Sequence, residues 1–198
     1  MTLPTQLILA SASPRRKALL RQIGLNFKVI PSHVHEPPYN GHDPVAYARG
    51  LATLKATEIA GKHPTALVVG ADTIVVVGEE VLGKPADKTS ALEMLEQLSG
   101  RSHQVITAYA LHLNGQGLQE VHSVSTRVHF KALKSYEIKR YIDSGGPFDK
   151  AGAYGIQDYS SIFVDEIQGC FYNVVGLPIS DFNQRLEALC TTHSISLR

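Results

Sequence analysis

The chain has little cysteine, no tryptophan and no long apolar segment. Cys170 and Cys190 are too few for a disulfide framework and lack the spacing of metal ligands, which is typical of a protein in a reducing compartment. No apolar run approaches the roughly 20 residues that a membrane-spanning helix needs, and the first residues lack the basic region and apolar stretch of a signal peptide. We therefore expect a cytoplasmic protein without a membrane partner.

An excess of charge of one sign is absent as well. The 198 residues include 19 Lys and Arg and 18 Asp and Glu, a net charge of +1. No overall electrostatic field therefore attracts nucleic acid. A chain of this length can bury a substantial core, and residues 1–198 fit one sizeable domain or two closely fused lobes. Any affinity for a phosphorylated molecule must come from a local site.

What is present first is a strand, a short polar loop and a helix near the N-terminus. Residues 7–10 are predicted to form a buried strand, and residues 14–23 a helix that ends before Gly24. Ser13 suits the N-cap because its hydroxyl can accept a hydrogen bond from a free N–H of the first turn. Pro14 suits the first helical position because it has no N–H to leave unpaired.

Three cations lie directly at this helix start. Arg15, Arg16 and Lys17 stand where the helix dipole is already positive, so they are locally unfavourable unless an anion binds there. Free N–H groups, the hydroxyls of Ser11 and Ser13, and two guanidinium groups together suit a phosphate. The alternative is the solvated basic face of an amphipathic helix. The neighbouring serines and the strand end favour phosphate binding.

Asp72 stands inside the most apolar segment, residues 66–77, which is predicted to be a core strand. A carboxylate in such a place is costly unless it is paired, hydrogen-bonded or bound to a metal, so its position indicates function. The alternative is an Asp that caps a turn after Gly70 and Ala71. The β-branched residues that continue after Asp72 disfavour it.

Two more charged candidates lie between these segments. Glu36 is in a loop, residues 31–43, whose three histidines suggest zinc, but no fourth ligand has the matching spacing. The helix predicted over residues 44–60 carries Lys55 at the edge of its buried face, with the ammonium free to reach a site.

Lys84 and Gln157 are the remaining candidates. Lys84 precedes Pro85, which stiffens the chain. Gln157 ends a glycine-punctuated loop, residues 149–157, where the backbone can come close to a ligand. Its amide can both donate and accept, as recognition of a base edge requires, although a lone loop Gln usually faces solvent.

The other expected elements follow from periodicity and turn residues. Thr89 or Ser90 is expected to cap a helix with an apolar stripe of Ala91, Leu92, Leu95 and Leu98, which Gly100 ends. We expect strands over 103–113 and 118–129, a helix over 135–144, a hairpin of strands 162–167 and 171–175, a last helix opened by Pro178, and loose final residues.

Four separated blocks of the chain resemble the Maf family of nucleoside triphosphate pyrophosphatases. They are Leu-Ala-Ser-Ala-Ser-Pro-Arg-Arg at 9–16, Gly-Ala-Asp-Thr at 70–73, Gly-Lys-Pro at 83–85, and residues 150–157 followed by Val-Gly-Leu-Pro at 175–178. The resemblance implies an α/β, two-lobed Maf/ITPase-like fold around a long bent mixed sheet with a cleft between the lobes. It also implies a homodimer that uses a divalent cation, Mg2+ or Mn2+.

The resemblance assigns roles residue by residue. The family's catalytic Asp matches Asp72, and its metal site matches Glu36 together with Asp72. The remaining matches are phosphate-binding positions at Ser11, Arg15, Arg16, Lys55 and Lys84, and positions tied to base selection at Arg15, Thr73 and Gln157.

These residues resemble the group that hydrolyses dTTP and UTP to the monophosphate and pyrophosphate. A sister group that acts on 7-methyl-GTP carries other residues beside the matches to Asp72 and Gln157. His35, where many members have an acid, bears on metal affinity, and Asp158, often Gly, bears on how closely the loop approaches the base. The alternative from another class is a non-catalytic nucleotide-binding regulator of cell division. Such a regulator needs the phosphate site but not a buried acid.

Overall fold

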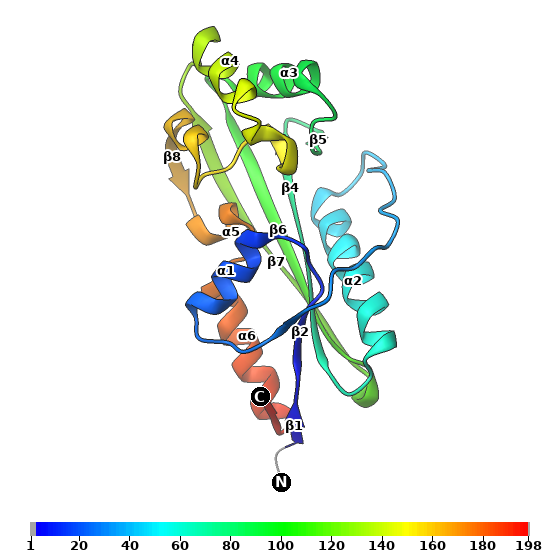
Figure 1. Cartoon of the computed structure of the whole chain (residues 1–198). Helices are drawn as coiled ribbons and strands as arrows, with labels where there is room; N and C mark the ends of the chain where they lie inside the picture. The colour runs from blue at the N-terminus through cyan, green and yellow to red at the C-terminus, as the bar shows by residue number, and fades with distance from the viewer. Residues whose placement is uncertain (1–2, 198) are drawn as a thin grey trace.

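The computed structural model describes residues 3–197, which form a seven-stranded mixed sheet covered by helices and a separate two-stranded sheet (Figure 1). The strands are β1 (Leu3–Thr5), β2 (Leu7–Leu9), β3 (Lys28–Val29), β4 (Leu67–Val77), β5 (Glu80–Leu82), β6 (Ser102–Leu113), β7 (Leu118–Phe130), β8 (Val164–Gln168) and β9 (Ile195–Leu197). The α-helices are α1 (Pro14–Gln22), α2 (Pro44–Lys62), α3 (Lys88–Leu98), α4 (Ser135–Asp143), α5 (Phe171–Val175) and α6 (Ile179–Thr192). Short 3-10 turns are η1 (Asn114–Gln116), η2 (Gly146–Asp149), η3 (Ala151–Ala153) and η4 (Tyr159–Phe163).

The large sheet has the strand order β3-β2-β4-β6-β7-β8, and β5 pairs with the far end of β4. β2 runs parallel to β3 and β4, whereas β4, β6, β7 and β8 are antiparallel neighbours. The long strands β4, β6 and β7 run lengthwise through the middle of the molecule (Figure 1). The expected α/β class with a long mixed sheet is confirmed.

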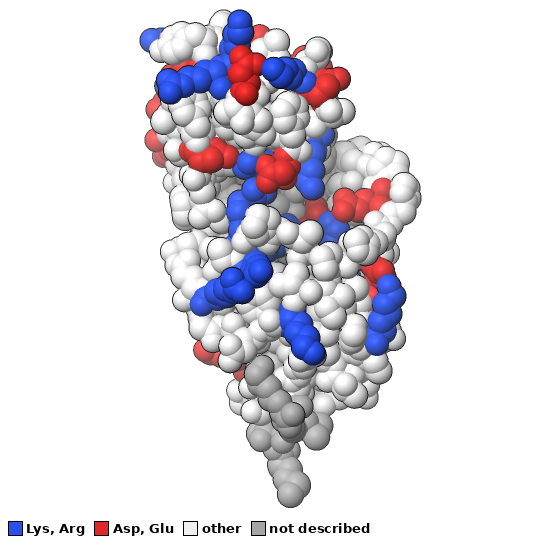
Figure 2. All heavy atoms as spheres, in the orientation of Figure 1, with Lys and Arg blue, Asp and Glu red and all other residues white. Residues whose placement is uncertain are grey.

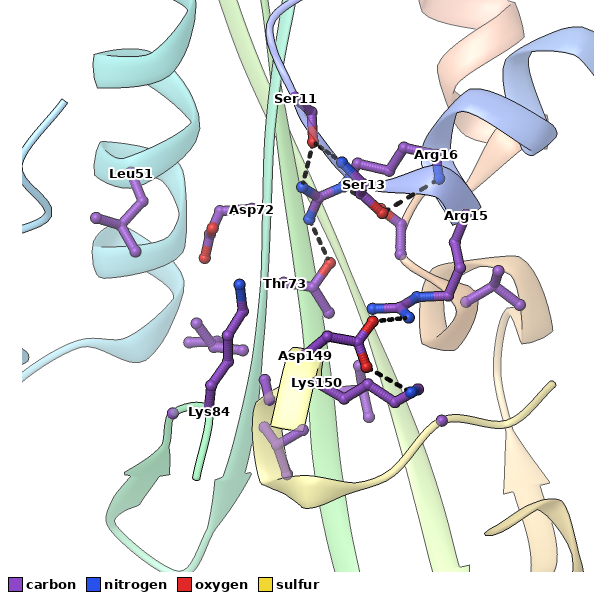
Figure 3. A pocket seen from close by; sticks show the side chains of 18 of the residues that line it. Ser11, Ser13, Arg15, Arg16, Leu51, Asp72, Thr73, Lys84, Asp149 and Lys150 are labelled. Carbon is purple, nitrogen blue, oxygen red and sulfur yellow. Dashed lines mark hydrogen bonds and ion pairs between the residues drawn. The ribbon is translucent and has the colours of Figure 1, made fainter. Parts of the chain in front are cut away.

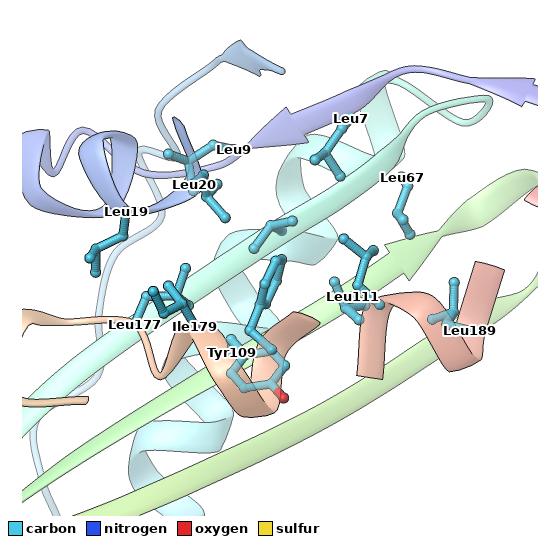
Figure 4. Close-up of a cluster of buried hydrophobic side chains, with 14 of the residues drawn as sticks. Leu7, Leu9, Leu19, Leu20, Leu67, Tyr109, Leu111, Leu177, Ile179 and Leu189 are labelled. Carbon is cyan, nitrogen blue, oxygen red and sulfur yellow. The ribbon is translucent and has the colours of Figure 1, made fainter. Parts of the chain in front are cut away.

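Three apolar clusters divide the molecule into two lobes on this sheet. In the first lobe, α1 and α6 pack on one face of the sheet around Leu7, Leu67 and Tyr109 (Figure 4), and α2 packs on the other face. In the second lobe, α3 and α4 enclose a cluster that includes Val75 and Phe130. Because β4 contributes to every cluster, residues near its middle lie at the junction of the lobes.

Gly70 sets how closely α2 approaches β4. A Cβ atom at this position would lie 2.3 Å from the Ala52 carbonyl oxygen and 2.6 Å from the Ala56 backbone nitrogen. Only glycine therefore allows the alanine-rich face of α2 to lie directly on the strand. This contact brings Lys55, which α2 carries, next to Asp72, two residues beyond Gly70.

The hairpin predicted over residues 162–167 and 171–175 is wrong. Residues 162 and 163 belong to η4, β8 begins at Val164, and the second segment is the helix α5. Its aromatic and β-branched residues favoured a strand, but such propensity depends on context. The Asn173 side chain donates to Val105 O (2.8 Å) and accepts from Thr107 N (3.2 Å), which holds this segment over β6.

Three smaller predictions also fail. Asp87, and not Thr89 or Ser90, caps α3, because its carboxylate accepts from Ser90 N at 2.8 Å while the Ser90 hydroxyl accepts from Asp87 N. Leu92 is 38% exposed and lies outside the apolar stripe of α3. The final residues are not loose, since β9 pairs with β1; Arg198 lies outside the described residues.

Among residues 3–197, no helix combines the length and the hydropathy that crossing a membrane requires.

Candidate active site

A cavity of about 630 Å³ lies between the two lobes. Basic and acidic side chains face one another across this hollow (Figure 2). All the site residues predicted from the sequence line it: Ser11, Arg15, Arg16, Glu36, Lys55, Asp72, Thr73, Lys84 and Gln157. The fold therefore gathers residues from six separate stretches of the chain at one place.

The N-terminal turn forms one wall of the cavity. β2 ends at Leu9, and Ala10 N donates to Val69 O at 2.8 Å, which fixes the start of the loop to β4. The Ser13 hydroxyl accepts from Arg16 N at 3.4 Å, so Ser13 caps α1 as predicted. The first turn of α1 contains no acidic residue. Its free N–H groups and positive dipole end therefore face a cavity that suits an anion.

Arg16 is buried behind this turn. Its guanidinium donates to Gly176 O (2.9 Å), Ser11 Oγ (3.1 Å) and Thr73 Oγ1 (2.9 Å) (Figure 3). Burial lowers the pKa of Arg16, and the negative charge of Asp72 opposes that shift. The protein thus holds Arg16 in one orientation before any ligand enters, with some of its N–H groups still available.

Asp72 projects from the middle of β4 and is compensated by a cation. Lys55 Nζ lies 2.5 Å from Asp72 Oδ1 and 2.8 Å from Glu36 Oε1. The side chains of Lys55 and Asp72 are 14% and 13% exposed, so this ion pair is screened little by water. Lys84, from the segment after β5, points into the cavity toward Asp72 (Figure 3). Of the three states that the sequence left open for Asp72, the structure shows an ion pair with Lys55, and both residues line the cavity. Their roles in the site stay predictions.

A charge network that sequence reasoning missed joins Arg15 on α1 to the second lobe. Asp149 Oδ2 lies 2.9 Å from Arg15 Nη1, and Asp149 Oδ1 lies 2.5 Å from Lys150 Nζ, which also pairs with Asp158 at 3.1 Å. Partial burial raises the pKa of Asp149, but the hydrogen bonds from Lys150 and Arg15 outweigh burial and lower the pKa. The adjacent opposite charges at the start of the glycine-rich loop were the available signal.

The glycine-rich loop that carries Gln157 is anchored to the second lobe. Gly152 N donates to Gly83 O at 2.9 Å, and Gly152 has φ +66° with Val75 side-chain atoms 3.0 Å from where a Cβ would stand. Tyr154 hydrogen-bonds to the buried His103 at 2.7 Å. Gln157 itself is exposed at the cavity wall.

The pair of carboxylates at the cavity fits a hard divalent cation. Oxygens of Glu36 and Asp72 converge on the Lys55 ammonium, so a metal ion between them requires that ammonium to move aside. Within residues 3–197, no group of three or more His, Cys, Asp or Glu is placed to hold a metal alone. Mg2+ is commonly held by one or two carboxylates plus substrate phosphates and water. The donor set therefore suits a cation that shares its ligands with a phosphorylated substrate.

Asp158 and His35, the two residues that depart from the family pattern, differ in their contacts. Asp158 caps η4 by accepting from Ser160 N at 3.0 Å, and it pairs with Lys150. His35 is exposed beside Glu36.

Comparison with known proteins places this geometry in a family. Residues 6–189 match the family described as Maf-like protein. The chain is 48% identical over 172 residues to the dTTP/UTP pyrophosphatase of Syntrophomonas wolfei, covering 87% of this chain and 91% of that protein. It is 49% identical over 174 residues to the dTTP/UTP pyrophosphatase of Symbiobacterium thermophilum, covering 88% and 89%.

A solved structure shares the fold at low sequence identity. The HAM1 protein of Coxiella burnetii superposes with a TM-score of 0.51 at 16% identity, covering 93% of this chain and 99% of that one. The match supports the expected Maf/ITPase-like architecture. From the family match over most of its length and from these relatives, the chain belongs to the Maf family.

Proposed function

We propose that this protein is a nucleoside triphosphate pyrophosphatase that hydrolyses dTTP and UTP to the nucleoside monophosphate and pyrophosphate. The observation that carries the proposal is Asp72, a buried carboxylate on a core strand that faces a cation-lined cavity. The relatives named dTTP/UTP pyrophosphatase support the substrate, since they match this chain over most of its length.

The triphosphate binds along the basic wall of the cavity. Lys55 and Lys84 meet its negative charge, together with Arg16, Ser11 and the N–H groups at the start of α1. A cavity of about 630 Å³ is large enough for a nucleotide. The base lies against Thr73, Gln157 and Arg15, which also line the cavity. Thr73 adjoins the phosphate-binding residues, since its hydroxyl accepts from Arg16.

Asp72 acts as the general base in this mechanism. It orients a water molecule and takes its proton while the water oxygen attacks the α-phosphorus in line. The bond from the α-phosphorus to the bridging oxygen breaks, and pyrophosphate leaves. Lys55 holds the carboxylate of Asp72 in place. Glu36 and Asp72 would hold Mg2+ or Mn2+, which when bound would neutralise charge on the phosphate oxygens.

Isotope-labelled water tests this reaction. In 18O-enriched water with UTP and Mg2+ or Mn2+, we expect UMP and unlabelled pyrophosphate, with one 18O atom in the UMP. A chelator should abolish the reaction if the cation takes part. Label in the pyrophosphate, or the products UDP and orthophosphate, would contradict attack at the α-phosphorus.

We also propose that the protein works as a homodimer in the cytoplasm, without nucleic acid as a partner. Both cysteines are free, which suits a reducing compartment, and the net charge is only +1. Light scattering on the purified protein should give twice the mass of one chain, and the mass of a single chain would contradict the dimer.

A further inference from the structure

Thr73 is the end of a buried hydrogen-bond chain that leads away from the cavity. Its hydroxyl lies 2.9 Å from the Thr107 hydroxyl on β6, and the Thr107 hydroxyl lies 2.8 Å from the backbone oxygen of Asn173 on α5. On the other side, Arg16 Nη2 lies 2.9 Å from Thr73 Oγ1. Thr107 and Asn173 are fully buried.

The direction of each hydrogen bond in this chain follows from simple counting. The Asn173 carbonyl has no hydrogen, so the Thr107 hydroxyl must donate to it. A hydroxyl has one hydrogen, so Thr107 can only accept from Thr73, and Thr73 must donate to Thr107. Arg16 has only donors, so Thr73 also accepts from Arg16.

Thr73 is therefore left with one acceptor position and no hydrogen to give. This matters for a base at the cavity wall, because uracil and thymine in a nucleotide carry a single N–H, at N3. A hydroxyl that can only accept can hydrogen-bond to such a base only through that N–H. Cytosine has no hydrogen at N3 and presents an acceptor there, which Thr73 in this state cannot satisfy; the only N–H donors of cytosine are on the amino group at C4, so the discrimination acts on a base that faces Thr73 with N3.

We propose that Thr107 and Asn173 are positioning residues that make Thr73 a pure hydrogen-bond acceptor, and thereby select a pyrimidine that carries a hydrogen at N3. This inference rests on the proposed hydrolysis of dTTP and UTP. Selection by the N3 hydrogen explains why one site takes both dTTP and UTP. The two nucleotides differ at C5 of the base and in the sugar, but both carry a hydrogen at N3.

Asn173 fixes the direction of the hydrogen bonds between Thr73 and Thr107. Its side chain donates to Val105 O (2.8 Å) and to Thr126 Oγ1 (3.0 Å), and accepts from Thr107 N (3.2 Å). These contacts hold α5 so that its backbone oxygen stays next to Thr107. A buried polar group with all of its partners in place has little freedom to reorient, so the Thr73 hydroxyl has one low-energy orientation.

The substitution Thr107→Val tests the inference. Valine has nearly the same shape and also favours a strand, and the Asn173 oxygen still accepts from Gly176 N at 3.1 Å. The Thr73 hydroxyl then loses its acceptor and becomes free to donate to N3 of cytosine. We expect the ratio of kcat/KM for UTP to that for CTP to fall about tenfold. This is the factor that corresponds to the free energy of one hydrogen bond, which wild-type protein makes with UTP but not with CTP.

Two control variants separate this effect from general damage to the fold. Thr107→Ser keeps the hydroxyl and should keep the wild-type ratio. Thr126→Val removes another buried hydroxyl that contacts Asn173 but not Thr73. It should lower the melting temperature and change the ratio much less than Thr107→Val does, because Asn173 keeps its contacts with Val105 O and Thr107 N.

The outcomes distinguish this inference from the proposed function. If wild-type protein prefers UTP to CTP and Thr107→Val keeps that preference, the inference is wrong and the function stands. The inference is also wrong if Thr126→Val lowers the ratio as much as Thr107→Val. If wild-type protein hydrolyses neither UTP nor dTTP, the proposed function itself fails.

Discussion

The two charged walls of the cavity differ in burial. On the inner wall, Asp72, Lys55 and Arg16 are largely shielded from water and are held by the core strand β4 and by α1 and α2. On the outer wall, Arg15 and Asp149 form an ion pair with side chains that are 27% and 58% exposed. Both walls carry cations next to carboxylates, but in different surroundings.

The difference in burial separates the tasks of the two walls. A charge pair away from water interacts more strongly, because the effective dielectric constant is lower and salt screens it less. Exposed pairs of the outer kind typically contribute about 0–1 kcal/mol and exchange partners easily. We therefore expect chemistry at the inner wall, and weak, replaceable contacts with a nucleotide at the outer wall.

The largest expected effect is that of Asp72→Asn. Loss of a well-placed general base typically costs about a hundredfold or more, so kcat for pyrophosphate release from UTP should fall by at least that factor. The circular dichroism spectrum should be unchanged. Near-normal turnover of this variant would mean that Asp72 is structural and that the inner wall does not carry the reaction.

The substitution Lys55→Met should follow in size. It leaves Asp72 and Glu36 facing each other without the ammonium that both contact. Removing one partner of a buried ion pair is strongly destabilising, and the general base loses its orientation. We expect kcat/KM for UTP to fall about ten- to hundredfold, together with a lower melting temperature, measured by steady-state kinetics and calorimetry. An unchanged kcat/KM would show that the pair has no part in the reaction.

The matched substitution on the outer wall, Asp149→Asn, should have a small effect, and on KM rather than on kcat. Asp149 neutralises Arg15 and Lys150, which an incoming triphosphate also attracts. Removal of its charge should lower KM for UTP about two- to fivefold and change kcat by less than about threefold, since exposed pairs are weak. A loss of kcat comparable with that of Asp72→Asn would contradict the division between the walls.

His103 anchors the outer wall to the core and gives a pH dependence of stability. Burial, and to a lesser extent the neighbouring His129, lower the pKa of His103 to about 4, and within residues 3–197 its buried Nδ1 has no hydrogen-bond partner. Because the unfolded chain binds this proton more readily, stability is full above an ordinary pKa of about 6.5 and is lost as pH falls toward about 4.

Urea unfolding at several pH values measures this effect. His103 should account for up to about 3 kcal/mol of the decrease in unfolding free energy between pH 7 and pH 4. The variant His103→Asn should show a correspondingly shallower dependence over the same range. The same pH dependence in the variant would mean that another group, such as the buried His112, is responsible.

The residues of the inner wall could be predicted from the sequence because they place charges where their own segments disfavour them. Asp72 interrupts an apolar run and pairs with Lys55. Of the three cations that follow the N-cap Ser13, Arg15 and Arg16 have partners outside their own segment. The residues of the outer wall could not be predicted in this way, because charged residues are common in a glycine-rich loop. The pairing of Asp149 with Arg15 depends on how the lobes face one another.

The chain of buried hydroxyls was hidden for a different reason. Thr107 is an unremarkable β-branched residue in a strand, and residues 171–175 read as a strand from their propensities. Only the packing of α5 on β6 turns Asn173 toward Thr107. Local sequence therefore predicted the elements that carry the chemistry, while contacts between distant segments decide the orientation of their polar groups.

The most direct test of the whole account is pyrophosphate release from dTTP, UTP, CTP, GTP, ATP and 7-methyl-GTP, each with Mg2+, with Mn2+ or with chelator. The account predicts metal-dependent cleavage of dTTP and UTP well above the other four. A preference for 7-methyl-GTP would keep the reaction but contradict the base selection assigned to Thr73 and Gln157. Tight binding without cleavage of any of the six would contradict the account and favour a nucleotide-binding regulator.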